Sequence, residues 1–197
     1  MVAFLSTFTI IMSNLCVLEY GQLIFKQSYK EDKSTKDYVS DRLSLYLLIA
    51  HLTAWIPTIL FGVLADRFKV WKLLLFAHLA SLASLVAFVL SVPSADHIYS
   101  EESPQSISMP ISFVLSYDMT ASTVALNAAL MSKSIASCSL SRGVFLGAQA
   151  LCSSCGILLI DGLGGHIYDY DKRNPYYICI SAECLVILVI VALAVCR

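Results

Sequence analysis

The sequence predicts an all-α membrane protein that crosses the bilayer with six transmembrane helices. Of its 197 residues, 58% are hydrophobic and only 14% are charged, and the mean hydropathy is +0.76. Soluble domains usually carry about a quarter charged residues. Six apolar stretches each approach the roughly 20 residues that a helix needs to cross a bilayer. They are 3–25, 43–64, 70–92, 109–131, 143–165 and 175–196.

These spans leave no room for a sizeable water-exposed domain, so we expect a single domain over residues 1–197. The first span has no Lys or Arg ahead of it and no small-residue cleavage site behind it, so we expect it to remain as a helix. Within the second span, Pro57 should kink the helix. The segments 26–42 and 93–108 are hydrophilic and predict longer connections.

The charges of the connections predict that both termini are cytoplasmic. Total Lys and Arg counts on the two sides are nearly equal and decide nothing. The 93–108 connection, however, has three acids and no Lys or Arg, whereas 65–72 and 132–142 together carry five basic residues and one acid. Short cytoplasmic loops are enriched in Lys and Arg. We therefore expect a multi-pass integral membrane protein with this orientation, in a membrane that the sequence does not specify.

Charge and cysteine content exclude several classes of function. With 13 Lys and Arg against 14 Asp and Glu, the chain has no basic field for nucleic acid. Its seven cysteines lie in or beside apolar segments and are expected as small buried side chains rather than disulfides. Cys152 and Cys155 have metal-ligand spacing but no second Cys or His pair, so neither a metal site nor a cofactor is expected.

A short loop motif carries a family resemblance. Residues 62–72 read GVLADRFKVWK, which resembles the G-x-L-A-D-R-x-G-R-[RK] loop of the major facilitator superfamily. That loop joins the second and third helices of a six-helix half. The resemblance implies that Gly62, Asp66 and Arg67 form a conformational gate, in which Gly62 admits a neighbouring helix and Asp66 caps or faces the next helix. The sequence departs from the motif at Lys69, and a plain basic turn is the alternative interpretation.

The fifth span adds a second resemblance, to the R-G-x-x-x-G…G-G-x-x-Y-D run of the fifth helix of such a half. It predicts close helix packing at small residues, namely Gly143, Gly147, Gly156, Gly164 and Gly165. Ile160 and Asp161 stand where antiporters of the family have Gly-Pro in their first half. The resemblance therefore favours the second half, and it implies one six-helix half of a major-facilitator-type bundle. A second half, or a homodimer, is the implied partner.

Ionisable residues inside spans are costly and usually face a cavity or a partner. Four acids, Glu19, Asp118, Asp161 and Glu183, fall in predicted spans that lack Lys and Arg, and with His51 they lie in the outer half of the bundle. Burial favours the uncharged form of a carboxyl group. We expect Glu19, Asp118, Glu183 and His51 to handle protons or a cationic solute. The alternative is headgroup contact for Glu19 and Asp161, and local hydrogen bonds for Asp118.

Neutral polar residues complete the predicted pathway. Asn14 and Asn127 lie on the first and fourth spans, which by family analogy line the central cavity, and we expect them to orient a polar solute. His78 is expected to be a packing residue. The predicted function is membrane transport of a small solute by alternating access, with protons as the candidate coupling ion and an organic anion as the least expected cargo.

The sequence raises two other classes of function. Asp118 and Asp161 resemble the two aspartates of intramembrane aspartyl proteases, but the acid comes first in its motif and the third motif of that family is missing. We therefore expect no enzyme. A non-transporting subunit of a membrane complex is the stronger alternative, because six helices alone lack the opposing half of a transporter.

Overall fold

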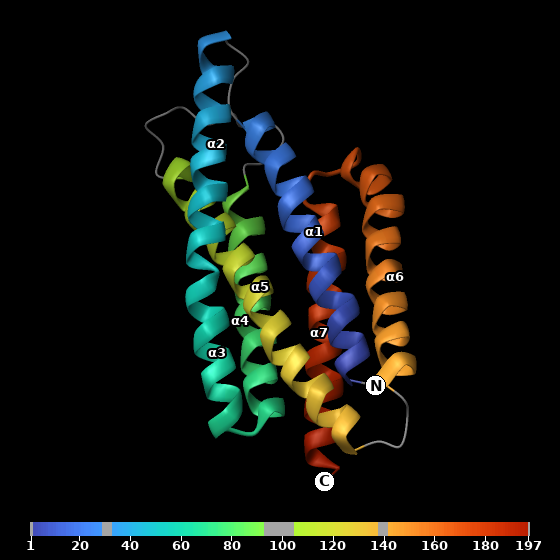
Figure 1. Cartoon of the computed structure of the whole chain (residues 1–197). Helices are drawn as coiled ribbons and strands as arrows, with labels where there is room; N and C mark the ends of the chain where they lie inside the picture. The colour runs from blue at the N-terminus through green and yellow to red at the C-terminus, as the bar shows by residue number, and fades with distance from the viewer. Residues whose placement is uncertain (1, 29–32, 93–104, 138–141, 197) are drawn as a thin grey trace.

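The computed structural model describes residues 2–28, 33–92, 105–137 and 142–196, and these form a bundle of α-helices (Figure 1). The helices are α1 (Val2–Ser28), α2 (Lys33–Thr53), α3 (Trp55–Arg67), α4 (Val70–Ser91), α5 (Gln105–Ser137), α6 (Arg142–Tyr168) and α7 (Asn174–Val195). No strand occurs in the described residues. The predicted loop 93–108 lies largely outside them.

Five described segments are long and apolar enough to cross a membrane. They are Val2–Ile24, Leu43–Arg67, Val70–Ser91, Gly143–Tyr168 and Asn174–Val195. These match five of the six predicted spans. The sixth, 109–131, forms the middle of α5, which is long enough but less apolar.

The composition of α5 follows from its position. It lies between neighbours and packs against α1, α3 and α4 (Figure 1). Ser116 donates to the Ser84 carbonyl oxygen of α4 at 2.9 Å, and the Ser112 and Ser91 hydroxyls are 3.0 Å apart. Neighbouring helices satisfy polar side chains that lipid would not, so this helix does not need an apolar surface all round.

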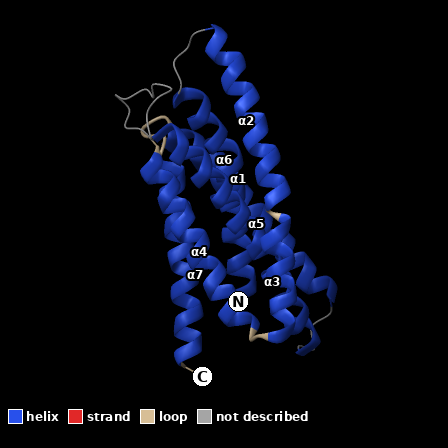
Figure 2. Cartoon of the chain, turned by 90° about the vertical axis from the view of Figure 1, so that its left-hand side faces the viewer, coloured by secondary structure: helices blue, strands red, loops and turns tan. Residues whose placement is uncertain are grey.

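One predicted connection is wrong in the part that the structure describes. Residues 33–42 were expected in a hydrophilic link, but they form the first half of α2. Figure 2 shows this end of α2 extending beyond the other helices. A helix can form there whatever surrounds it, because its backbone hydrogen bonds are internal.

The second predicted span is broken, as expected from Pro57. The chain leaves α2 after Thr53 and enters α3 at Trp55. Pro57 has no backbone N–H to donate to the carbonyl of Thr53, four residues earlier, and its ring crowds that carbonyl. The break therefore falls where this hydrogen bond is lost.

Two apolar clusters occupy opposite ends of the bundle. One includes Phe88, Phe113 and Tyr176, and the other includes Leu74 and Val186. Between them along the helices lies a band of buried polar side chains, which we call the polar layer. Its members are Ser6, Thr7, Thr9, Ser13, His78, Ser81, Ser84, Ser116, Asp118, Thr120, Ser122, Thr123 and Glu183. Most buried polar side chains thus lie between the two clusters, while Ser91 and Ser112 lie at one end and Asn127 at the other.

Candidate functional site

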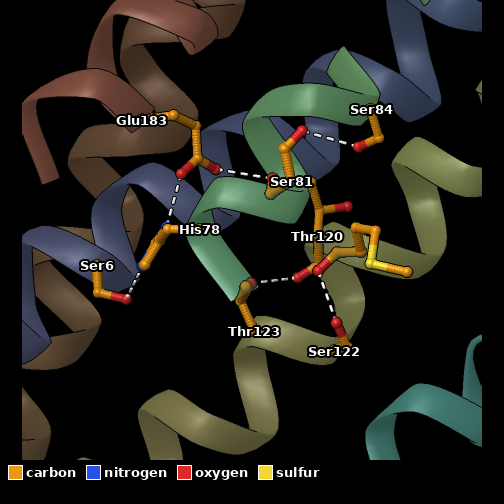
Figure 3. A network of polar contacts seen from close by, with 9 residues as sticks. Ser6, His78, Ser81, Ser84, Thr120, Ser122, Thr123 and Glu183 are labelled. Atoms are coloured by element: carbon orange, nitrogen blue, oxygen red, sulfur yellow. Dashed lines mark hydrogen bonds and ion pairs between the residues drawn. The ribbon is translucent and has the colours of Figure 1, made fainter. Parts of the chain in front are cut away.

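The centre of the polar layer is an imidazole–carboxyl pair between α4 and α7. His78 Nδ1 lies 2.6 Å from Glu183 Oε2, and the two side chains are 0% and 1% exposed. Ser81 donates to Glu183 Oε1 at 2.9 Å. On the other side, His78 Nε2 lies 2.9 Å from the Ser6 hydroxyl of α1. Figure 3 shows this chain of contacts joining three helices.

The helix positions explain why these groups meet. His78 and Ser81 are three residues apart on α4 and so lie on one face of that helix. Ser6 on α1 and Glu183 on α7 approach this face from two sides (Figure 3). An ionisable pair without water is stable only when its remaining polar atoms are hydrogen-bonded, which the two serines accomplish.

Glu183 was predicted as a pathway residue, whereas His78 was predicted only to pack. The structure joins them, so sequence reasoning missed His78 together with Ser6 and Ser81. A signal was present in the sequence, because His78, Ser81 and Ser84 form a polar stripe at helical spacing on an otherwise apolar helix.

Asp118 occupies a second position in the polar layer, at the break between α2 and α3. Its carboxyl accepts a hydrogen bond of 3.1 Å from Thr53, the last residue of α2. The local partners predicted for Asp118 are therefore replaced by a residue of another helix. Thr53 had no signal in the sequence, because only the tertiary fold brings residue 53 to residue 118.

His51 is exposed on α2, two residues before Thr53. Its Nδ1 is 2.7 Å from the Leu47 carbonyl oxygen of its own helix, and its ring lies 4.9 Å from that of Tyr117. His51 thus contacts the residue before Asp118, while Thr53, two residues after His51, contacts Asp118 itself.

Asn14 and Asn127 lie on α1 and α5, two helices that pack against each other. Asn127 Nδ2 donates to the Thr7 hydroxyl at 2.6 Å. The side-chain oxygens of both asparagines are buried and have no hydrogen-bond partner among the described residues. Buried unsatisfied amide oxygens are rare in proteins, and they are acceptors that a polar solute can use.

Glu19 is separate from the predicted acids Asp118 and Glu183. Its side chain is exposed on α1 and interacts with the exposed carboxyl of Asp161 on α6. The predicted acids and His51 therefore do not form one cluster. They divide into three groups: the His78–Glu183 pair, Asp118 with Thr53 and the nearby His51, and the Glu19–Asp161 pair.

The predicted gate residues do not cap the helix that follows them. Asp66 and Arg67 are exposed in the last turn of α3, and α4 begins from Lys69 with no side-chain cap. Asp66 thus does not cap α4, because three residues separate it from the first helical residue. Lys133 of α5 instead donates to the Ala65 carbonyl oxygen at 3.1 Å. This missed residue places a cation at the carboxyl end of α3, where the helix dipole favours it.

The predicted packing glycines fall into two groups. A Cβ on Gly156 would lie 2.8 Å from the Phe8 carbonyl oxygen, and a Cβ on Gly164 would overlap the Tyr20 ring. These two glycines allow α1 and α6 to approach closely. Gly143, Gly147, Gly165 and the gate residue Gly62 have no described atom within 4 Å of such a Cβ. Among the described residues these four glycines face open space.

An open crevice lies between the end of α5 and the start of α6. Its volume is about 660 Å³, within the range of small-molecule sites. The lining is mostly apolar, with Ser132 and Gln149 as polar groups, and comprises Ala128, Met131, Ser132, Ile135, Ala136, Leu146 and Gln149. It would suit an uncharged or amphipathic molecule.

The described residues contain no group of three His, Cys, Asp or Glu side chains placed to hold a metal ion. The six described cysteines are free thiols, of which Cys16 and Cys179 are buried, and Cys138 lies outside the described residues. What the sites offer chemically is proton binding and hydrogen bonding. Comparison with protein families, curated proteins and solved structures finds no match for this chain.

Proposed function

We propose that the chain is a six-helix half of a major-facilitator-type secondary transporter, which moves a small solute across a membrane by alternating access. The observation that carries this proposal is the polar layer. Helices long and apolar enough to cross a membrane place two acids, a histidine and many hydroxyls at mid-depth, between two apolar clusters. Intramembrane ionisable groups are expensive and mark ion or substrate pathways.

Further features support transport. The second span is divided at Ala54, and discontinuous helices near mid-depth are common where transporters bind their cargo. The unsatisfied oxygens of Asn14 and Asn127 offer acceptors to a solute. Residues 2–25 and the whole of α7 contain no Lys or Arg, so a neutral or cationic solute fits this half better than an organic anion.

The proposal requires a second six-helix half, supplied by another polypeptide or by a second copy. Alternating access needs two halves that rock against each other around a central site. The open glycines of α6 support such a contact, because nothing within the described chain packs on Gly143, Gly147 or Gly165.

The test is uptake into proteoliposomes that contain the full chain. Radiolabelled sugars, neutral amino acids and organic amines are offered with and without an inward proton gradient, and a protonophore serves as the control for coupling. We expect accumulation of at least one neutral or cationic solute above protein-free liposomes. No uptake from the panel, by the chain alone or with a co-purified six-helix partner, would contradict the proposal.

A non-transporting subunit of a membrane complex is the second candidate. The same open face of α6 favours it, since that face would equally suit a fixed contact with a larger assembly. Chemical cross-linking in native membranes separates the two. A dimer or a complex with another six-helix half supports transport, whereas a stable complex with an unrelated membrane protein supports the subunit.

A further inference from the structure

The His78–Glu183 pair is enclosed on every side that the structure describes. The side chains are 0% and 1% exposed, and their polar atoms bond to each other, to Ser6 and to Ser81. With neutral His78 and ionised Glu183 the pair carries a charge of −1. One additional proton makes the pair neutral overall, whether the proton is on the imidazole or on the carboxyl.

Ser6 allows the pair to exist in both states without an unsatisfied polar atom. When His78 Nε2 is unprotonated, the Ser6 hydroxyl donates to it. When Nε2 carries a proton, the same hydroxyl accepts, across the same 2.9 Å separation. A hydroxyl that rotates in place is what a reversible proton site needs, because an unpaired buried donor would oppose one of the two states.

Charged groups near the pair determine whether the closed bundle favours the pair with or without the additional proton. The charged and titratable groups on the surrounding helices are Cys16, Glu19, Tyr20 and Lys26 on α1, Lys72 on α4, Tyr117, Asp118 and Lys133 on α5, Arg142, Cys152, Cys155, Asp161, His166 and Tyr168 on α6, and Tyr176, Tyr177, Cys179 and Cys184 on α7. Lys72 is exposed with its ammonium over the Trp71 ring, Asp118 bonds to Thr53, and Glu19 interacts with Asp161. Cys179 bonds to the Met12 carbonyl oxygen, and Tyr176 to that of Cys16. Lys72, Asp118, Glu19, Cys179 and Tyr176 thus have interactions of their own away from the pair. A net charge of −1 on the pair is unfavourable without water.

We propose that His78 and Glu183 form a proton-binding site whose occupancy controls the separation of α1 from α4 and α7. The bound proton stabilises the closed bundle. Loss of the proton leaves a buried negative charge, which favours a conformation in which water reaches the pair. Ser6 is the contact of this network on α1, so a movement of α1 away from His78 exposes the site.

Within the proposed transport function, this site is where the coupling proton binds, and that part of the inference rests on the proposed function. The proton-controlled opening of the bundle does not rest on the proposed function. If one proton is bound in the closed state and released in the open state, the open-to-closed ratio rises about tenfold for each pH unit, until the open state dominates. Raising the pH favours opening, because the closed state binds more protons.

The experiment measures helix separation directly. Spin labels are attached at Leu23→Cys on α1 and Leu90→Cys on α4, both exposed positions, in a full-length chain whose seven native cysteines are replaced by serine. Distances between the labels are recorded by pulsed electron paramagnetic resonance in lipid nanodiscs frozen at a series of pH values. We expect a longer-distance population that grows as the pH rises.

The variants separate a proton site from a structural clamp. Glu183→Gln should remain closed at every pH, and Glu183→Asp should restore the pH dependence. Ser112→Ala removes a neutral hydroxyl contact between α4 and α5 and should keep the wild-type pH dependence. If Glu183→Gln does not fold, Glu183→Met, which has a similar volume and no titratable group, should show the same loss of pH dependence.

Three outcomes would overturn the inference: label distances independent of pH, a Glu183→Gln variant with wild-type pH dependence, or one that is open at every pH. Solute uptake together with pH-independent distances would overturn this inference alone. Conversely, pH-dependent opening without uptake of any solute would overturn the transport proposal and leave the proton site in place.

Discussion

Single residues in this bundle act through what a neighbouring helix places beside them. Gly156 lies against the backbone of Phe8, whereas Gly147, nine residues earlier on the same helix, faces open space. The sequence predicted close packing for both, because it shows glycine spacing but not which side of α6 meets α1. Their different environments make a matched pair of substitutions.

We expect Gly156→Ala to destabilise the protein by about 1–3 kcal/mol, because the new methyl would lie 2.8 Å from a backbone oxygen. Thermal unfolding in detergent measures the effect. Gly147→Ala is the control and should be neutral or stabilising by up to about 1 kcal/mol through helix propensity. Equal melting temperatures for the two variants would contradict the α1–α6 packing.

Asp118 is the other carboxyl of the polar layer. Asp118→Asn keeps an oxygen to accept the Thr53 hydroxyl but removes the charge. We therefore expect unchanged thermal stability and loss of proton-coupled uptake in the proteoliposome assay. Uptake with unchanged pH dependence would remove Asp118 from the mechanism and leave proton handling to His78 and Glu183.

At the scale of elements, the division of the second span at Pro57 places Thr53 beside Asp118. Pro57 interrupts the helix, and the interruption leaves Thr53 at the end of α2, where it meets Asp118. The kink was predictable from the proline. Its consequence for Asp118 was not, since the contact joins residues 65 positions apart.

We expect Pro57→Ala to restore the missing backbone hydrogen bond and to slow hydrogen exchange of the amides from residue 54 to residue 58. Mass spectrometry of the exchanged peptides reports the change. Pro175→Ala is the control, because Pro175 lies in the first turn of α7, where no such bond is lost. Exchange that is unaltered in Pro57→Ala would show that the break has another cause.

The connection between α3 and α4 is the second element with a predicted role. Just before it, Lys133 of α5 donates a hydrogen bond to the carbonyl oxygen of Ala65, the residue that precedes Asp66 in α3. If this connection is a gate, Asp66→Asn should slow the conformational cycle and leave the choice of solute unchanged. Initial uptake rates across the solute panel measure both. A transport rate equal to that of the wild type would contradict the gate assignment.

At the scale of the whole molecule, the question is whether α5 crosses the membrane. Five described segments meet the length and composition expected of a span, and α5 is less apolar. Its position inside the bundle explains the difference, because polar side chains such as Ser116 and Asp118 are buried against other helices. Figure 1 shows both termini toward the same end of the bundle, as an even number of crossings requires.

We expect epitope tags at the two termini to lie on the same side of the membrane, the cytoplasmic side. Antibody binding before and after selective permeabilisation measures this. With five crossings the tags would lie on opposite sides, so that result would place α5 outside the set of spanning helices.

The sequence by itself determined most of the helices and which of them are long and apolar enough to cross a membrane. Hydrophobicity summed over about 20 residues is a local property, so five spans could be read from it, and Pro57 located the break. Glu183 and Asp118 were recognisable as unusual because charge inside an apolar stretch is costly wherever the helix goes.

Only the tertiary structure decided the partners. His78 was a lone histidine in the sequence, and it became half of an ionisable pair because α4, α7 and α1 meet at one depth. The tertiary structure also separated Glu19 from Asp118 and Glu183, and it divided the glycines into packed and open positions. The physical reason is that a hydrogen bond or a steric contact depends on which helix faces lie together, and that arrangement is not encoded in any one segment.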